Sequence, residues 1–246
     1  MACPRAGRAV TTVVSRSQRT AAKVVGFTYL AALVPAVFAE FYVPTRFYVA
    51  NNAVETAHRI MTHERLFRLG IASNLIVFSI DVALIAALYV VLEPVSRGLA
   101  LYAAFFRLVE TAVLFATTFS DFTVLRLLSG AEYLRAIDPD RLAALARVAF
   151  LAHGDIYSVG LFLCGVGYPV FNYLWLKSGY IPKPLAAFGL FATLWLGAWV
   201  FALIVFPELR RPVAILIYGP PIFLFEVTIG IWLLARGLRT AEAASP

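Results

Sequence analysis

The chain has 246 residues, of which 61% are hydrophobic and 14% are charged, and its mean hydropathy is +0.83. Soluble domains are nearer half apolar and a quarter charged, and a soluble core of this length could not bury so much apolar surface. The composition therefore excludes an ordinary water-soluble domain and indicates an all-α, polytopic membrane bundle.

Residues 1–21 form a basic N-terminal tail before the first apolar run. Its positive side chains, with the one that follows them, are Arg5, Arg8, Arg16, Arg19 and Lys23. Basic clusters beside a membrane helix bind anionic headgroups, so we expect the lipid bilayer as the partner of this tail. Nucleic acid is the rival partner, and we do not expect it, because no nucleic-acid-binding fold follows the tail.

Six apolar runs are long enough to cross a bilayer, which needs about 20 residues of helix per crossing. They predict transmembrane helices at residues 22–43, 67–92, 98–119, 142–176, 184–206 and 213–234. These helices form one domain over residues 22–236, followed by a C-terminal tail at 237–246. The first run resembles a signal peptide, but it stays apolar through Val43, so we interpret it as a helix. The length of the fourth helix predicts either a tilt or a break at Pro169, and we expect Gly219-Pro220-Pro221 to interrupt the sixth.

The two longer connections are amphipathic. The first, from Pro44 to Leu66, carries Val54, His58 and Met61 at helical spacing. The second covers residues 120–141, and its apolar residues are Leu125, Leu128, Tyr133 and Leu134. Both patterns predict amphipathic helices that lie at the membrane interface.

An even number of crossings places both termini on the same side of the membrane. Lysine and arginine are evenly split between the two sides, so the basic N-terminus decides the orientation. We expect a multi-pass protein of the plasma membrane with cytoplasmic termini. The sequence does not indicate an oligomeric state.

Ionisable residues recur inside five of the six runs. They are Glu40, Asp81, Arg107, Glu110, His153, Asp155 and Glu226. A charge at the bilayer centre costs about 2.5–3.5 kcal/mol on insertion scales, so such residues normally face the bundle interior and find partners. Arg107 and Glu110 share a helix face and can pair, whereas His153 and Asp155 point to nearly opposite sides.

Six of these residues are candidates for a ligand or proton site. They are Asp81, Arg107, Glu110, His153, Glu226 and Glu40. Proline precedes two of the carboxylates by five residues, at Pro35 and Pro221, and broken helices often line binding sites in transporters. The alternative interpretation is a network of ion pairs that only holds the helices together.

The residues that known intramembrane chemistries need are scarce. There are three histidines, of which only His153 lies in an apolar run, so we expect no metal, haem or other cofactor. We expect no catalytic residue, since no nucleophile elbow or phosphate-binding glycine loop is present. Cys3 and Cys164 are too few for a disulfide framework.

Short motifs across nearly the whole chain resemble a bacterial integral-membrane family, the domain of unknown function 4386. The motifs are Ala50-Asn51-Asn52-Ala53 with Glu55, Phe67-Arg68-Leu69-Gly70, Phe106 to Glu110, His153-Gly154 with the glycines up to Gly165, and Tyr173-Leu174 with Lys177 to Pro182. Lys177 stands where the family pattern leads us to expect arginine. The resemblance implies a shared multi-helix membrane fold, and it brings no activity because the family is uncharacterised.

Three classes of function remain. A binder or transporter of a small molecule or protons would use the buried charges and show a polar cavity open to one side. A structural or regulatory membrane protein would show the same charges paired and dry. An intramembrane enzyme is the third, and it would need His153 beside a nucleophile or a metal.

Overall fold

The structure is a computed structural model that describes residues 14–209 and 214–239, and in this part of the chain it contains helices and no strand. The helices are α1 (Arg16–Val37), η1 (Phe38–Tyr42), α2 (Val43–Phe47), α3 (Ala53–Thr62), α4 (Glu64–Leu92), α5 (Arg97–Leu127), η2 (Glu132–Leu134), α6 (Pro139–Ser178), α7 (Lys183–Val205), η3 (Pro207–Leu209) and α8 (Ala214–Ala235). Element η1 is a π-helical turn, and η2 and η3 are single 3-10 turns.

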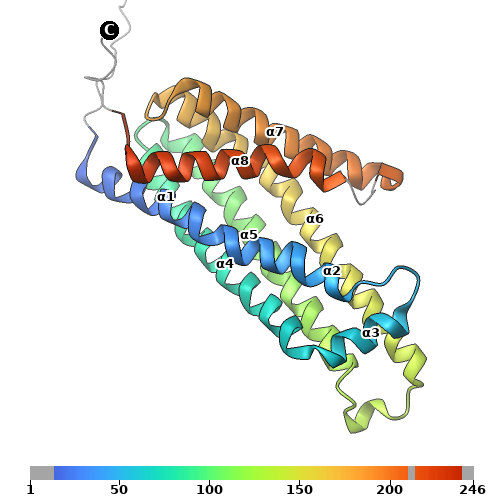
Figure 1. Ribbon diagram of the computed structural model, residues 1–246. Helices are drawn as coiled ribbons and strands as arrows, with labels where there is room; N and C mark the ends of the chain where they lie inside the picture. The colour runs from blue at the N-terminus through green and yellow to red at the C-terminus, as the bar shows by residue number, and fades with distance from the viewer. Residues whose placement is uncertain (1–13, 210–213, 240–246) are drawn as a thin grey trace, which may run out of the picture.

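Six helices of the described residues are long and apolar enough to cross a membrane. The first joins α1, η1 and α2 into one rod over Arg16–Phe47, and the others are α4, α5, α6, α7 and the stretch Ile217–Ala235 of α8. This confirms the predicted all-α bundle of six apolar helices. Figure 1 shows that α1 begins and α8 ends at the same end of the bundle, while α3 lies at the other end.

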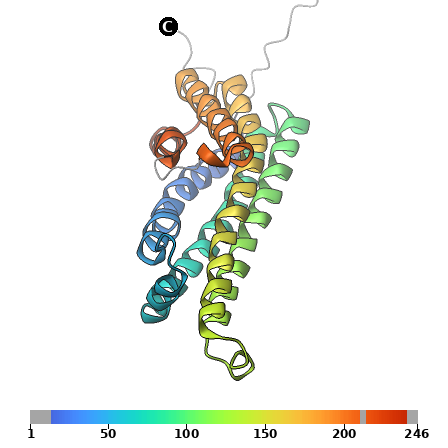
Figure 2. The same cartoon turned by 90° about the vertical axis from the view of Figure 1, so that its right-hand side faces the viewer.

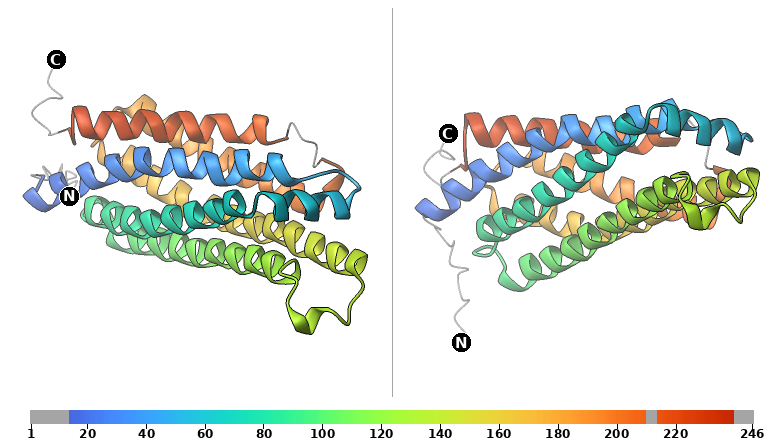
Figure 3. Two further views of the ribbon diagram at one scale, coloured as in Figure 1. Left: turned by 60° about the horizontal axis from the view of Figure 1, so that its bottom comes forward. Right: turned by 90° about the horizontal axis from the view of Figure 1, so that it is seen from below.

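The six long helices form a ring. Each packs on the next in chain order, from α1 through α4, α5, α6 and α7, and α8 closes the ring by packing on α1. The longest contact joins α5 and α6, which run side by side along most of their length in Figure 2. Figure 3 shows the long helices running roughly along one direction, with α3 and η2 at the end away from the start of α1.

Two glycine pairs allow helices of this ring to approach closely. A side-chain carbon at Gly26 of α1 would lie 2.9 Å from the carbonyl oxygen of Gly230 on α8. One at Gly165 of α6 would overlap the backbone of Gly197 on α7. Small residues at membrane helix crossings let backbones meet in this way. The ring therefore depends on glycine at the α1–α8 and α6–α7 crossings.

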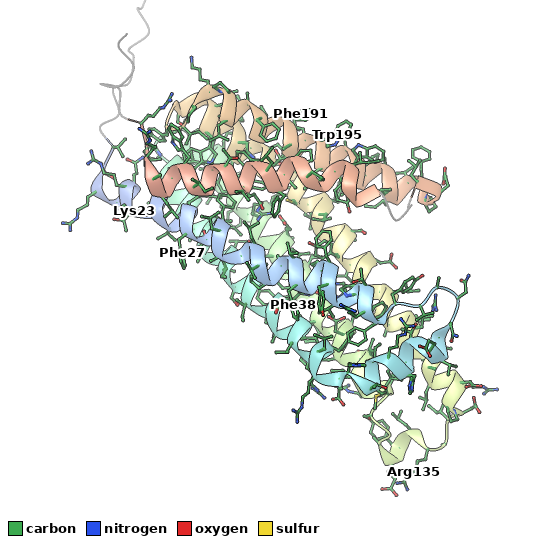
Figure 4. The ribbon with its side chains drawn as sticks, in the orientation of Figure 1. Lys23, Phe27, Phe38, Arg135, Phe191 and Trp195 are labelled. Carbon is green, nitrogen blue, oxygen red and sulfur yellow. The ribbon has the colours of Figure 1, made fainter. Side chains whose placement is uncertain are left out.

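Large apolar side chains cover the outside of the ring. Phe27 of α1 and Phe191 of α7 are 65% and 53% exposed and point away from the bundle in Figure 4. In a soluble protein such a surface would aggregate, whereas in a bilayer it faces lipid tails. The exposed apolar surface therefore agrees with the composition.

The third predicted helix is longer in the structure than the sequence pattern suggested. It was expected to end at residue 119, but α5 continues to Leu127, so the connection that follows holds only the 3-10 turn η2. The expected amphipathic helix in this second connection is wrong. Its first polar residues face α6 instead, because Ser120 donates a hydrogen bond to the carbonyl of Ala149 at 2.5 Å and Asp121 bonds to His153.

The first connection does contain the predicted helix, α3. It packs on α6 and buries Thr56 and Ile60, while Val54 and Met61 of the expected apolar face are exposed. At the chain start, residues 1–13 of the expected basic tail lie outside the described residues, and Arg16 already begins α1.

Neither of the two helix breaks expected at proline is present. Helix α6 runs for 40 residues through Pro169, and α8 runs through Pro220 and Pro221. Pro221 cannot donate to the carbonyl of Ile217, four residues earlier. The indole Nε1–H of Trp195 on α7 donates to that carbonyl at 3.1 Å instead. A neighbouring helix thus supplies the missing hydrogen bond, and α8 continues.

Candidate functional site

Most of the ionisable residues within the bundle form two groups, together with polar neighbours. One group, called the end site, consists of Glu40, Asn74, Asp121 and His153, toward the end that carries α3. The other, called the central cluster, consists of Tyr29, Arg107, Glu110, Cys164, Tyr168 and Glu226. On α5, 14 residues separate Arg107 from Asp121, which at about 1.5 Å per residue is about 21 Å. The predicted charges therefore do not converge on one cavity.

His153 connects two carboxylates in the end site. Its Nδ1 lies 3.0 Å and 3.1 Å from the two carboxylate oxygens of Asp121. Its Nε2 lies 3.4 Å and 3.5 Å from the two carboxylate oxygens of Glu40. The side chain of Asn74 donates to Glu40 at 2.8 Å. Four helical segments, η1, α4, α5 and α6, thus meet in one hydrogen-bonded chain.

The local backbone of the first long apolar helix, Arg16–Phe47, explains where Glu40 lies. Glu40 is the middle residue of the π-helical turn η1, which begins at Phe38, labelled in Figure 4. Pro44 follows the turn and cannot donate to the carbonyl of Glu40, and its ring would clash with that carbonyl in a regular α-helix. A π turn accommodates this, and π turns inside α-helices are frequent at functional sites.

A pocket of about 260 Å³ adjoins the end site. Its polar lining comes from Glu40, Asn74, Asp121 and His153, and most of the remaining lining is apolar, including Phe67, Ile71, Phe150 and Leu151. Gly154 also lines it, and a side-chain carbon there would meet no atom within 4 Å. The end site therefore faces open space along α6.

The pocket is rich in hydrogen-bond acceptors and poor in positive charge. Its lining includes two carboxylates and no lysine or arginine. The amide oxygen of Asn74 is buried and has no hydrogen-bond partner among the described residues. A buried acceptor without a donor is costly, so a donor from a ligand would be stabilising there.

The ion pair at the middle of the central cluster is buried. Arg107 and Glu110 are 5% and 3% exposed, and the guanidinium Nη1 lies 2.5 Å and 2.6 Å from the two oxygens of Glu110. The same Nη1 lies 3.1 Å from the sulfur of Cys164, and the guanidinium stacks 4.8 Å from the ring centre of Tyr168. The predicted pairing of Arg107 with Glu110 is confirmed.

Tyrosines extend this cluster to α1 and α8. The hydroxyl of Tyr168 donates to Tyr29 at 2.6 Å and lies 3.2 Å from the carboxylate of Glu226. Asp81 interacts electrostatically with Arg107 from α4, but it makes no hydrogen bond or ion pair of its own within the described ranges. The central cluster thus links four helices of the ring through one buried arginine.

An apolar layer separates the two groups. It consists of Ala32 and Ala36 of α1, Val77 and Phe78 of α4, Leu114 and Phe115 of α5, and Tyr157 of α6. On α1, α5 and α6 the layer falls between the end site and the central cluster in sequence, and on α4 it falls between Asn74 and Asp81. The ring of Tyr157 stacks on His153 with centroids 6.2 Å apart. The layer isolates the central cluster from the pocket.

Sequence reasoning predicted one of the contacts between these ionisable residues, the pairing of Arg107 with Glu110. It missed Asp121, which was assigned to a connection. The spacing of Leu114, Thr118, Asp121 and Leu125 repeats every three or four residues and could have extended the helix. Asp155, two residues from His153, is exposed and does not line the pocket.

No group of three or more His, Cys, Asp or Glu side chains within residues 14–209 and 214–239 is arranged to hold a metal ion. The lining of the pocket includes no serine, threonine or cysteine. The end site can therefore hold a proton and accept hydrogen bonds from a ligand, and its lining offers no nucleophile to His153.

Comparisons with known proteins agree with this fold and add no activity. The family described as "Domain of unknown function (DUF4386)" matches residues 24–237, a range that includes every residue of both polar groups. An uncharacterised protein of Archaeoglobus fulgidus is 26% identical over 181 residues, which cover 72% of this chain and 88% of that protein. No solved structure matches the chain significantly.

Proposed function

Because the chain belongs to the DUF4386 family, whose function is unknown, we propose from the end site that it is a multi-pass membrane protein that binds a small organic cation in exchange for a proton. The observation that carries this proposal is His153 held between Glu40 and Asp121 at the wall of a pocket. Intramembrane ionisable residues that line a cavity mark ligand or proton pathways in membrane proteins.

The hydrogen-bonding arrangement explains why the site would hold a proton. Both ring nitrogens of His153 face carboxylate oxygens. A neutral imidazole has one N–H, so it can donate to only one of two ionised carboxylates. If one further proton is bound, either on the imidazole ring or on a carboxyl group, both the His153–Asp121 contact and the His153–Glu40 contact become hydrogen bonds. The site then retains one net negative charge.

That remaining charge favours a cationic ligand. A small ammonium group could donate hydrogen bonds to Glu40 while its apolar part contacts Phe67 and Ile71. Drug-sized ligands occupy pockets of about 300–1,000 Å³, so a pocket of about 260 Å³ suits a smaller molecule. Loss of the shared proton when the cation binds keeps the charge of the site constant.

The test is a binding assay with matched ligands. Ethylamine, butylamine and benzylamine are each compared with the corresponding alcohol, and the melting temperature of the purified protein is measured. We expect the amines to stabilise the protein more than the alcohols, because binding to the folded state raises stability. Calorimetry in two buffers of different ionisation enthalpy then reports the released proton.

Matched variants locate the effect. Asp121→Asn should abolish the preference for amines, whereas Asp155→Asn, which removes the same charge two residues from His153 on α6, should keep it. Equal stabilisation by amines and alcohols, or equal behaviour of the two variants, would contradict the proposal.

The central cluster supports a different role. Its arginine is buried and paired, so the structural interpretation of the intramembrane charges fits it better than ligand binding. We also retain as proposals the plasma membrane location and the cytoplasmic termini. With that orientation the pocket lies nearer the opposite side of the membrane.

A further inference from the structure

A second hollow lies between α4 and α5 at the end of the bundle that carries α3. Its volume is about 520 Å³, and it is independent of the cation pocket. It is lined by Arg68, Phe119, Phe122, Thr123, Leu125, Arg126 and Ser129. Two arginines, two hydroxyls and two aromatic rings thus surround one open space.

Both guanidinium groups keep N–H donors that are not used in an ion pair. Arg68 uses its Nε to bind Glu64 at 2.7 Å, in a pair that is 54% and 40% exposed. An arginine carries five N–H donors, so the terminal nitrogens of Arg68 retain theirs. The side chain of Arg126 has no carboxylate partner within the described ranges and is exposed. The hollow therefore has an excess of positive charge.

The order of residues along α5 gives the hollow a polar rim and an apolar wall. Arg126 lies in the last turn of the helix. Phe122 and Phe119 precede it by four and seven residues, which places them about 6 Å and 10 Å closer to the middle of the bundle. Phe119 is 72% exposed and Phe122 is 41% exposed. A ligand that contacts both parts needs an anionic head and an apolar tail.

We propose that this hollow binds the phosphate headgroup of an anionic phospholipid, with Arg68 and Arg126 on the phosphate and the two phenylalanines against an acyl chain. Arginine binds phosphate oxygens through paired N–H donors, and the excess of positive charge favours a headgroup with a net negative charge. Thr123 and Ser129 also line the hollow, but their hydroxyls donate to the backbone carbonyls of Phe119 and Arg126, so the phosphate donors come from the two arginines. The expected ligand chemistry is a phosphate ester, and its lipid origin follows from the aromatic wall.

The test measures the melting temperature of the detergent-solubilised full-length protein with added phosphatidylglycerol, phosphatidylcholine or soluble glycerol 3-phosphate. We expect phosphatidylglycerol to raise the melting temperature more than phosphatidylcholine does, and glycerol 3-phosphate to have little effect. The variant with Arg68→Gln and Arg126→Gln should bind phosphatidylglycerol at least about tenfold more weakly, because two charge-assisted contacts are lost. Native mass spectrometry counts the retained lipids.

A matched double variant controls for net charge. Arg59 forms the same kind of exposed pair, with Glu55 at 2.7 Å, and Arg135 lies in the η2 loop in Figure 4; neither lines the hollow. Arg59→Gln with Arg135→Gln should leave the lipid preference intact. Equal stabilisation by the two lipids, equal loss in both double variants, or an equal effect of glycerol 3-phosphate would overturn the lipid assignment. Arg126→Gln alone, in an exposed position, repeats the test with a smaller perturbation.

Discussion

The end site and the central cluster use similar residues in opposite ways. Both place carboxylates inside an apolar bundle, but the central cluster pairs Glu110 with a buried arginine, whereas the end site shares one histidine between two carboxylates beside a pocket. A paired and buried charge cannot be given up without leaving its partner uncompensated. A carboxylate beside a pocket can change its partner. Whether a carboxylate is paired in the core or borders a pocket therefore distinguishes charges that hold helices together from charges that can bind a ligand.

The strongest test of this comparison is the removal of Arg107. We expect Arg107→Ala to lower stability by about 3–5 kcal/mol, because Glu110 would remain buried without its counter-ion. Glu40→Ala should cost much less, since Glu40 borders the pocket. The measurement is the melting temperature of both purified variants in the same detergent. Arg107→Met with Glu110→Leu, which removes both charges, should recover much of the loss. Equal melting temperatures for Arg107→Ala and Glu40→Ala would remove the distinction between the two groups.

The second prediction concerns the tyrosines. Tyr168→Phe should destabilise the protein by about 1–3 kcal/mol, because it removes a buried hydroxyl that bonds to Tyr29 and leaves Glu226 without that contact. Tyr157→Phe is the matched control in the apolar layer, since this hydroxyl makes no hydrogen bond within the described part of the chain. Chemical denaturation should show a loss for the first variant and almost none for the second. A larger loss of stability for Tyr157→Phe than for Tyr168→Phe would show that the Tyr157 hydroxyl makes a stabilising polar contact, and the layer would then not be apolar.

The sequence predicted much of the fold because a helix able to cross a membrane is apolar over about 20 residues, and such a run can be recognised from the sequence alone. The pairing of Arg107 with Glu110 was also predictable, since residues three apart share a helix face. The end site was not. Asp121 and Ser120 resemble loop residues until their partners on α6 are known, and hydrogen bonds between residues about 30 positions apart leave no local pattern.

The same reason explains the error at Pro220 and Pro221. A proline pair predicts a break when only the local chain is considered. Trp195 lies 22 residues before Ile217, on the neighbouring helix, and donates a hydrogen bond to its carbonyl. Because that carbonyl has a partner, the helix does not have to break at the proline pair. Local rules describe helices well in this chain, and they fail where another helix supplies a missing donor or acceptor.

A third prediction compares access to the two groups. Gly154 lines the pocket with open space around it, whereas Cys164 is 4% exposed beside Arg107. In a Cys3→Ser background, Gly154→Cys should react with a water-soluble maleimide at least about tenfold faster than Cys164, because thiol reactivity needs exposure. Labelling at each position is followed by mass spectrometry. Comparable rates would mean that both groups are closed or that both are open, and the comparison would fail.

The smallest expected effect is on the stability of the end site itself. Glu40→Gln keeps the shape of the side chain and an oxygen that can accept the hydrogen bond from Asn74. We expect a change in unfolding free energy of less than about 1 kcal/mol, as for most substitutions that create no cavity and strand no charge. The same variant should lose the preference for amines over alcohols, because one carboxylate of the pocket is neutral. A stable protein without this preference assigns Glu40 to binding. A variant that melts as early as Arg107→Ala would instead make the end site a second structural cluster, and the pocket would then be a packing defect beside it.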